Sequence, residues 1–418
     1  MFPTQFTGAS FTWERKKLGI LTTRVRSYSF SRSVEVKEET GVKYVHYGDI
    51  HTSVANEIGK NNNLPFINET YKESDELKLD DVIVADASED YKGIADAAVI
   101  ISNLPYTIIA GLHTIALRPT SLIKGYFLYH IFKTENFKRF GYKIGTGLKV
   151  FGISYNNLAK YKVYYPQEIE EQEKIIGILS NLTNSINLHE RKCEELTLIK
   201  KALLQKLFPK KEEVRPEVRY KNFSDAWEQR KLGEVADVID PHPSHRAPAE
   251  VKIGIPFIGI SDVNEIGEIN YSTVRVVDED IYEEHHRRYD LSIPSLGIGR
   301  VASLGKVIRL RNDIGKYAIS PTMSVLQPDT RIEINYLYSY MNSSQFQKQF
   351  SAKSNGSTRQ SVGIKDLRTL VVSVPSSSNE QQKIGEYFSK FDSLIALHQR
   401  KLEKLKQLKK FLLQNMFI

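Results

Sequence analysis

Two segments of the chain carry apolar residues at alternating steps of four and three, the spacing that gives a long helix one apolar face. The first stripe comprises Ile175, Leu179, Leu182, Ile186, His189, Cys193, Leu196, Lys200, Leu203 and Leu207. The second comprises Ile384, Phe388, Phe391, Ile395, His398, Leu402, Leu405, Lys409, Leu412 and Met416. Neither stripe is stable in water, so we predict that the two helices pack on each other.

The two helical segments are copies of one sequence. Residues 171–208 align without a gap to residues 380–417 at a shift of 209, which pairs His189 with His398. A second match opens each half, because WERKKLG at 13–19 resembles WEQRKLG at 227–233, at a shift of 214. A repeat of this kind indicates two structural units built on one plan, with the intervening segments free to differ.

The intervening segments predict mixed globular domains. Short β-branched runs at 81–85, 306–310 and 370–374 are bounded by turn residues and predict strands, whereas 126–140 and 336–350 each predict one helix. We therefore predict an α+β fold in which two globular domains are separated by the two long helices, with a pseudo-twofold internal repeat. The expected bounds are 1–166 for the first domain, 167–210 for the central helix, 211–375 for a linker and the second domain, and 376–418 for the C-terminal helix.

Composition narrows the function. The 418 residues include 58 Lys and Arg against 50 Asp and Glu, a net charge of +8 that suits a polyanionic partner. The single cysteine, Cys193, excludes an intrachain disulfide and is expected to be an apolar filler of the first helix. No run of about 18 apolar residues occurs, so we expect no membrane insertion and a cytoplasmic protein.

Asn103-Leu104-Pro105-Tyr106 resembles the target-base loop of N6-adenine methyltransferases, in which an aromatic ring stacks on a flipped base. Such an enzyme also needs a glycine-rich turn after a strand to hold S-adenosylmethionine. Nothing upstream qualifies, and Gly145-Thr146-Gly147 lacks both a convincing preceding strand and an acidic ribose ligand. A methyltransferase is thus a minor alternative, and a surface turn is the better interpretation.

The whole arrangement resembles the specificity (S) subunit of Type I restriction-modification enzymes. The resemblance rests on two variable domains, each introduced by a Trp-Glu-x-x-Lys-Leu-Gly-like phrase and followed by a Glu-Gln-x-Lys-Ile helix that ends in Leu-Leu-Gln-x-x-Phe. One departure is that Phe6 precedes Trp13 by seven positions, whereas Phe223 precedes Trp227 by four.

The resemblance implies a non-catalytic, DNA-binding chain. Each variable segment would be a target recognition domain that reads one half of a bipartite asymmetric site in double-stranded DNA. The two long helices would form an antiparallel coiled coil that spaces these domains. They would also dock two modification subunits, which restriction subunits then join. No cofactor is expected on this chain, because S-adenosylmethionine, ATP and Mg are expected on the partner subunits. The alternative from another class is a coiled-coil interaction scaffold that binds no DNA.

Base readout requires Arg, Lys, Asn, Gln, Ser and Thr on loops that enter a groove. The densest such loop is 353–360, and its counterpart in the first half is 143–149. The predicted DNA-binding residues are Lys353, Asn355, Ser357, Thr358, Arg359, Lys143, Thr146, Lys149, His245, Arg246, Arg300, Ser303, Lys306, Arg24, Arg26 and Arg32. For any one cation the alternative is an ordinary solvated charge. His285-His286-Arg287-Arg288 is expected to be an exposed basic corner, and no metal site is predicted.

Two equal helices that run antiparallel would cross a pseudo-twofold axis near their midpoints. The midpoint of the first helix lies next to His189, and that of the second lies next to His398. We therefore predict that the two histidines lie close together on the seam as neutral imidazoles, because two like charges in a poorly solvated seam are costly. The alternative leaves each histidine half-exposed with no mutual contact.

Overall fold

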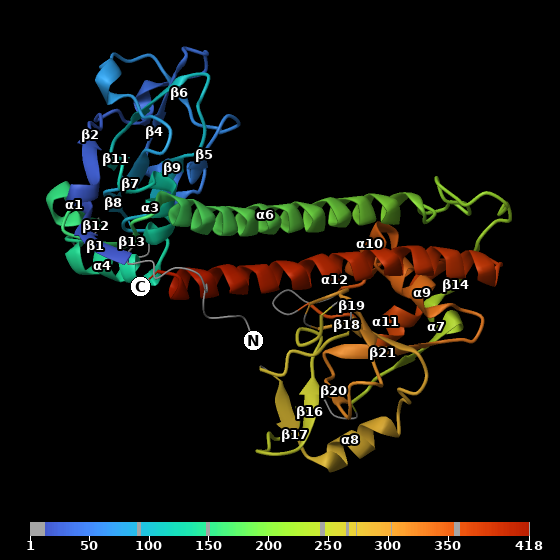
Figure 1. Ribbon diagram of the computed structural model, residues 1–418. Coiled ribbons are helices and arrows are strands. Elements are labelled where there is room, and N and C mark those ends of the chain that lie inside the picture. The colour runs from blue at the N-terminus through green and yellow to red at the C-terminus, as the bar shows by residue number, and fades with distance from the viewer. Residues whose placement is uncertain are drawn as a thin grey trace. The chain divides into compact units, whose positions relative to one another are not determined.

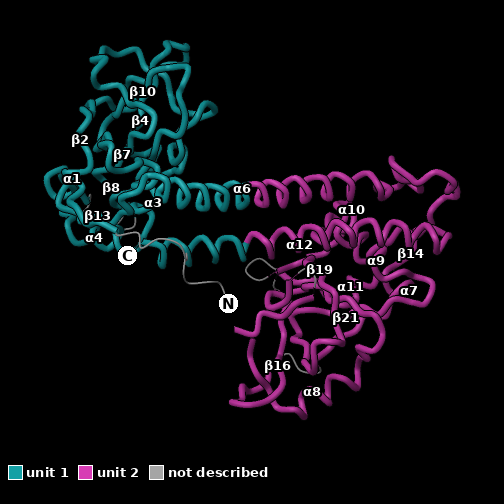
Figure 2. The backbone as a smooth tube through the Cα atoms, in the orientation of Figure 1, with its two compact units in different colours: residues 1–187, 403–418 teal, residues 188–402 magenta. Residues whose placement is uncertain are grey.

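The computed structural model describes residues 13–89, 93–147, 151–242, 247–264, 267–272, 274–301, 303–354 and 360–417. The chain divides into two compact units, residues 1–187 with 403–418 (unit 1) and residues 188–402 (unit 2), as Figure 2 shows. The two long helices, α6 (Ile169–Lys206) and α12 (Ser378–Asn415), belong to both units, since α6 begins in unit 1 and α12 begins in unit 2. None of the described helices is long and apolar enough to span a membrane.

Unit 1 is built on two sheets (Figure 1). The larger has the order β2 (Thr22–Val25), β11 (Thr114–Pro119), β7 (Val82–Ala85), β9 (Ala97–Ile100) and β5 (Glu57–Ile58). The other has the order β10 (Thr107–Ala110), β4 (Val42–Val45), β6 (Phe66–Ile67) and β3 (Glu35–Val36). Every residue of β7 and β9 is buried, as expected for apolar runs covered on both faces, and the strand predicted at 81–85 is confirmed as β7.

The remaining elements of unit 1 surround these sheets. Two short pairs are β1 (Trp13–Lys17) with β13 (Lys162–Pro166) and β12 (Phe151–Gly152) with β8 (Ala87–Ser88). The helices are α1 (Leu18–Leu21), α2 (Tyr47–His51), α3 (Gly125–Phe132), α4 (Glu135–Ile144) and α5 (Tyr155–Leu158), with 3-10 turns η1 (Arg32–Val34) and η2 (Glu73–Asp75). Helix α3 packs on β7 and β9 and contributes to the core beneath the larger sheet.

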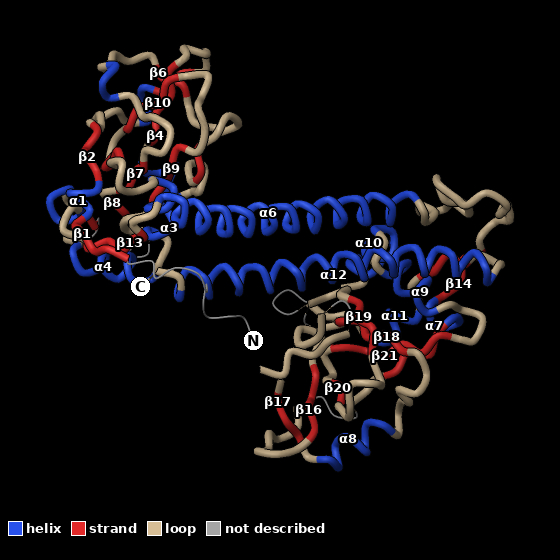
Figure 3. The backbone as a smooth tube through the Cα atoms, in the orientation of Figure 1, coloured by secondary structure: helices blue, strands red, loops and turns tan. Residues whose placement is uncertain are grey.

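Unit 2 has a related but different set of strands (Figure 3). Its larger sheet has the order β15 (Ala236–Ile239), β21 (Met323–Pro328), β18 (Ser295–Gly299) and β19 (Val307–Leu310). A second sheet has the order β17 (Arg275–Val277), β16 (Ile255–Ile258) and β20 (Ala318–Ile319), and β14 (Glu228–Lys231) pairs with β22 (Val371–Val374). Its helices are α7 (Leu232–Val235), α8 (Glu279–His286), α9 (Ile334–Met341), α10 (Ser344–Ala352) and α11 (Ile364–Arg368). The strands predicted at 306–310 and 370–374 are confirmed as β19 and β22.

The segments 126–140 and 336–350, each predicted as one continuous helix, each form two helices, so this prediction was wrong. In unit 1 the break follows α3, where the Thr134 hydroxyl accepts the N–H of Phe137 at 3.3 Å and starts α4. In unit 2 the Ser343 hydroxyl does the same for Phe346 at 3.3 Å and starts α10. Ser and Thr favour such N-caps over helix interiors, which explains both breaks.

The repeated phrases close each unit in the same way. Trp13 to Lys17 form β1, which pairs antiparallel with β13 just before α6. Of their counterparts at 227–231, Glu228 to Lys231 form β14, which pairs antiparallel with β22 just before α12. The repeated helix ends complete the cores, because Phe417 packs on Phe127 in unit 1 and Phe208 packs on Trp227 in unit 2. The repeat therefore marks the residues that join a globular fold to its long helices.

The two helices run antiparallel in each unit. In unit 1, Lys409 Nζ donates to Thr183 Oγ1 at 2.7 Å. In unit 2, His189 contacts His398, and Lys200 pairs with Asp392, so residue numbers rise along α6 as they fall along α12. Every residue of both predicted stripes is buried or half-buried, which confirms that the stripes form the packed faces.

One buried ion-pair cluster joins α6, α12 and the larger sheet of unit 2. Asp392 is only 6% exposed, and its carboxylate accepts from Lys200 and, at 3.2 Å, from both terminal nitrogens of Arg309. The Arg309 guanidinium also lies 3.6 Å from the ring centroid of Tyr338. Loss of the carboxylate would leave two cations close together with little water around them.

We expect Asp392→Ala to lower the free energy of unfolding by about 3 kcal/mol, the cost of removing one partner from a buried ion pair. Chemical denaturation of the full chain measures this change. Asp237 is exposed on β15, and Asp237→Ala is the control that should change stability by less than about 0.5 kcal/mol. Equal stability of the two variants would show that the Asp392 cluster does not stabilise the fold.

Candidate DNA-binding surface and the helix seam

Two candidate segments of unit 2 are joined by hydrogen bonds of their described residues. Lys353 is exposed at the C-terminal end of α10, and beyond the residues that the structure leaves undescribed the N–H of Val362 donates to the Arg300 carbonyl at 2.9 Å. Gln347 on α10 also donates to the carbonyl of Gly305 at 2.8 Å. Arg300 and Gly305 thus lie beside Val362 and the helix α10. Asn355, Ser357, Thr358 and Arg359 lie outside the described residues, as do His245 and Arg246.

Two of the predicted cations in unit 2 have partners within the fold. Arg300 pairs with Asp240 at 3.1 Å, and its side chain is only 12% exposed. Lys306 donates to the carbonyls of Ile260 at 3.0 Å and Val263 at 2.7 Å, so it holds the chain of the neighbouring loop. Ser303 is exposed at φ +47°, at the tip of the turn. Of this group, Ser303 and Lys353 are the side chains that the structure presents to solvent.

The candidate DNA-binding residues of unit 1 also divide into exposed side chains and side chains that have partners within the fold. Arg24 and Arg26 are exposed, each within 5.3 Å of a tyrosine ring, Arg24 beside Tyr155 and Arg26 beside Tyr28. Lys143 and Thr146 are exposed at the end of α4, and Lys149 lies outside the described residues. Stacking on a ring holds a guanidinium in place while leaving its N–H groups available to an acceptor.

Arg32 is engaged by two carboxylates of its own domain. It pairs with Glu35 and with the buried Asp49, each at 2.8 Å, and these hydrogen bonds help to raise its pKa although burial opposes them. Asp49 in turn accepts the backbone N–H of His46 at 2.9 Å in the capping box that starts α2. The structure thus gives Arg32 a role in fixing this short helix.

In the Asn103–Tyr106 segment, Asn103 and Pro105 are exposed, whereas Tyr106 packs against the fold. The Tyr106 hydroxyl accepts from Asn62 Nδ2 at 2.6 Å, and the buried ammonium of Lys43 lies 4.5 Å from the ring centroids of both Tyr106 and Phe66. Burial lowers the pKa of Lys43. The Tyr106 ring therefore already has a cation and a neighbouring aromatic ring against it, which favours the surface-turn interpretation of this motif.

The predicted histidine pair is present. His189 Nδ1 lies 2.7 Å from His398 Nδ1, and the ring centroids are 4.9 Å apart, so the expectation that these side chains lie close together is confirmed. A hydrogen bond between the two Nδ1 atoms needs at least one neutral imidazole as acceptor. Burial, followed by the charge of His189, lowers the pKa of His398.

A second histidine pair was missed, and the expectation of an exposed basic corner at 285–288 was wrong for His285. His285 is fully buried, and its Nε2 lies 2.5 Å from Nδ1 of His242. Burial lowers the pKa of His285 to about 4, assisted by the charge of His242. The signal lies in the step of four that places Ile281 and His285 on one face of α8. Arg287 and Arg288 are exposed as expected. No group of three potential metal ligands occurs among the described side chains.

Comparison with known proteins defines the class. Residues 12–198 and 224–407 both match the family model described as the Type I restriction modification DNA specificity domain. The chain is 24% identical over 338 residues to the putative type I restriction enzyme MjaX specificity subunit of Methanocaldococcus jannaschii, covering 74% of this chain and 72% of that protein. It is also 25% identical over 257 residues to the MjaVIII specificity subunit of the same organism, and that alignment spans 58% of either protein.

Solved structures from Type I restriction-modification systems have a similar fold. The crystal structure of the Type I restriction-modification S subunit from M. genitalium has a TM-score of 0.60 at 14% identity, covering 100% of this chain and 99% of that one. A chain from a structural study of complex assembly and conformational transition in the type I R-M system has a TM-score of 0.52 at 16% identity, with 97% and 98% covered. This chain belongs to the family of Type I restriction-modification specificity subunits.

The lowered pKa of His398 gives a pH dependence with a defined sign. Because the folded chain disfavours the charged imidazole, the unfolded chain binds more protons below the ordinary pKa of about 6.5. The stability from the pair is therefore complete above about pH 6.5 and is lost as the pH falls through the lower folded pKa.

We expect His398→Gln to make the free energy of unfolding fall less steeply between about pH 7 and pH 5 than it does in the wild type. Denaturant titrations of the variant and the wild type across this range measure the difference between their slopes. The lowered pKa values of His130 and His285 act in the same direction, but they affect both proteins equally, so the difference reports on the His189–His398 pair alone. Gln399→Ala on the exposed side of α12 should leave the wild-type profile unchanged. A His398→Gln profile that overlays the wild type would refute the role of the pair.

Proposed function

We propose that this chain is the subunit through which a Type I complex reads DNA, each globular unit recognising one half of a bipartite asymmetric site. The observation that carries the proposal is the repeat of one joining scaffold, β1 with β13 and β14 with β22, around two different sets of strands and loops. Equal scaffolds with unequal loops suit two unequal half-sites, because the loops set the base contacts while the frame sets their position.

The long helices have the properties of a spacer and a docking platform. A coiled coil with a pseudo-twofold repeat would fix the separation between the two half-sites, whatever the loops recognise. Large apolar side chains are also exposed on the helices away from the packed stripes, namely Ile178, Leu188, Leu198, Ile199, Leu394, Leu397 and Phe411. We infer that two modification subunits cover these side chains, because exposed apolar groups in number mark protein interfaces. Protonation of the His189–His398 pair would weaken this assembly below about pH 6.

Chemistry would reside in the partner subunits. S-adenosylmethionine would bind the modification subunits, and ATP with Mg would bind the restriction subunits that join them. This chain would determine which sequence of double-stranded DNA the complex binds, and it would methylate nothing by itself. The packed state of Tyr106 supports this view, because a base-stacking ring needs an open face.

The rival function is a scaffold that binds no DNA and whose net charge of +8 only keeps it solvated. Filter binding of the complex with modification subunits separates the two, using methylatable and scrambled duplexes at several salt concentrations. A DNA-reading subunit gives an affinity that falls steeply with salt and differs between the duplexes. A flat salt dependence would establish the scaffold instead.

Exchange of residues 220–375 for those of a related subunit should change one half-site and leave the other half-site unchanged. The physical reason is that this segment, which starts before β14 and ends after β22, folds on its own sheets. Mapping of adenine methylation in cells that carry the exchanged chain measures the outcome. A simultaneous change in both half-sites would contradict separate recognition by the two units.

Arg359 lies in the candidate loop with the highest density of polar residues. If it reads a guanine, Arg359→Ala should cost about 1 to 3 kcal/mol in binding and relax the preference at one position only. Competition binding with duplexes that differ at single positions measures this effect, and Lys210→Ala in the exposed segment after α6 is the control. An equal loss on every sequence would instead make Arg359 a phosphate contact.

A further inference from the structure

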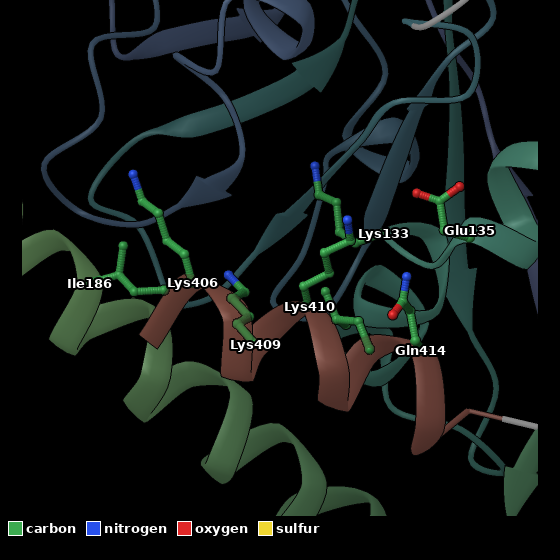
Figure 4. A pocket seen from close by; sticks show the side chains of 8 residues that line it. Lys133, Glu135, Ile186, Lys406, Lys409, Lys410 and Gln414 are labelled. Carbon is green, nitrogen blue, oxygen red and sulfur yellow. The ribbon is translucent and has the colours of Figure 1, made fainter. Parts of the chain in front are cut away.

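A lysine-lined cavity of about 230 Å³ lies in unit 1, between α12, α6 and the turn that joins α3 to α4. Four lysines line it, namely Lys133 at the turn and Lys406, Lys409 and Lys410 on α12, and the other lining residues are Glu135, Ile186, Leu413 and Gln414. Figure 4 shows that the side chains of Lys406, Lys409 and Lys410 extend from α12 on the side of this helix on which Lys133 lies. We name this cavity the lysine pocket.

Two of the lysines have hydrogen-bond acceptors within the fold. Lys133 donates to the carbonyl of Ala97 at 3.3 Å, and Lys409 donates to the neutral hydroxyl of Thr183 at 2.7 Å. Burial lowers the pKa of Lys133 to about 8, and the positive charges of Lys138 and Lys409 add to the effect although Asp96 opposes it. Asp96 itself is paired with Lys138 and His51. Burial lowers the pKa of Lys409 as well, against the opposing charge of Glu57.

Unit 2 provides an internal comparison. The shift of 209 places Asp392 at the position of Thr183, and Lys200 at the position of Lys409. In unit 2 this lysine meets a buried carboxylate, whereas in unit 1 the equivalent lysine meets a hydroxyl. The same shift replaces Lys406 by Thr197, and Asn342 occupies the helix-end position of Lys133. Unit 2 therefore neutralises the site that unit 1 fills with cations.

We propose that the lysine pocket binds a phosphate group. Lysine ammonium groups bind phosphate oxygens as point charges, and the Gln414 amide can donate a further hydrogen bond. The volume lies below the roughly 300 to 1,000 Å³ of sites for whole small molecules, so it fits one phosphate rather than an entire cofactor. Burial is the main cause of the lowered pKa of Lys133, and an anion beside the lysines would offset the repulsion from Lys409 that adds to it. The phosphate belongs either to the DNA backbone or to a free phosphate compound, and only the first source rests on the proposed function.

Two variants and a matched control test the pocket in the full-length chain. Thr183→Asp places beside Lys409 the carboxylate that unit 2 already carries beside Lys200, so the fold should tolerate it. Lys410→Gln removes one exposed lysine of the pocket. The control is Lys201→Gln, which removes the exposed counterpart of Lys410 at the same shift of 209 and changes the net charge equally.

The first arm uses inorganic phosphate as the probe. Phosphate at constant ionic strength should raise the thermal midpoint of the wild type and of Lys201→Gln, because a ligand that binds only the folded state stabilises it. The rise should be smaller in Lys410→Gln and absent in Thr183→Asp. The second arm uses labelled duplex DNA at several salt concentrations. Lys410→Gln and Thr183→Asp should each reduce the slope of log affinity against log salt by about one unit, whereas Lys201→Gln should not.

The two arms of the experiment distinguish the two possible sources of the phosphate. They also distinguish failure of the lysine pocket from failure of the proposed function. A response in the DNA arm assigns the pocket to the DNA backbone, and a response in the phosphate arm alone assigns it to a free phosphate compound. Wild-type behaviour of both pocket variants in both arms would overturn the pocket while leaving the proposed function standing. A wild type that binds no DNA but is stabilised by phosphate would overturn the proposed function while leaving the pocket standing.

Discussion

The burial of one apolar stripe on each long helix is the constraint on which the rest of the structure depends. Neither helix could remain folded with its stripe in water, and each finds its partner in the other copy of the repeat. The same packing brings the end of each helix to the core that it completes. Phe208, from the end of α6, stacks on Phe388 within unit 2, and Phe417, from the end of α12, contacts Phe127 within unit 1. The chain therefore cannot form either core from one half of its sequence alone.

Polar residues within the stripes give the packing its register. A seam of leucines alone would tolerate sliding by a heptad, but a seam that must bring His189 to His398 and Lys200 to Asp392 would lose these contacts on any slip. A slip would leave buried charges without partners. The free-energy cost of an unpaired buried charge exceeds the modest stabilisation that each pair contributes, so the pairs restrict the register more than they stabilise the fold. Lys200 and Lys409 interrupt the two stripes at equivalent positions, which shows that the interruptions belong to the repeated plan.

The features that the sequence predicted share one property, since they depend on local spacing or on the comparison of one segment with another. The stripes, the strands β7, β19 and β22, the joining phrases and the contact between His189 and His398 all follow from such patterns. The misses depend on partners that are distant in sequence. Nothing near Arg300 or Lys306 indicates that Asp240 and the carbonyl of Val263 hold them. Similarly, no local feature shows that Asp392 would recruit Arg309 from β19. The breaks at Thr134 and Ser343 were accessible from capping preference, but apolar residues on both sides outweighed that signal.

The two units show how one scaffold can carry different chemistry without a change in its frame. At the position shared by Thr183 and Asp392, a hydroxyl and a carboxylate each satisfy a lysine on the neighbouring helix, so packing is preserved in both units. The electrostatic result is different, because the carboxylate cancels a charge that the hydroxyl leaves in place. A carboxylate in place of Thr183 should cost unit 1 little stability, because a lysine already stands opposite it, whereas unit 2 needs its carboxylate to balance both Lys200 and Arg309. A duplicated scaffold can therefore diverge first in charge at sites beside the helices, while its helix ends and joining strands, which complete the cores, retain their sequence.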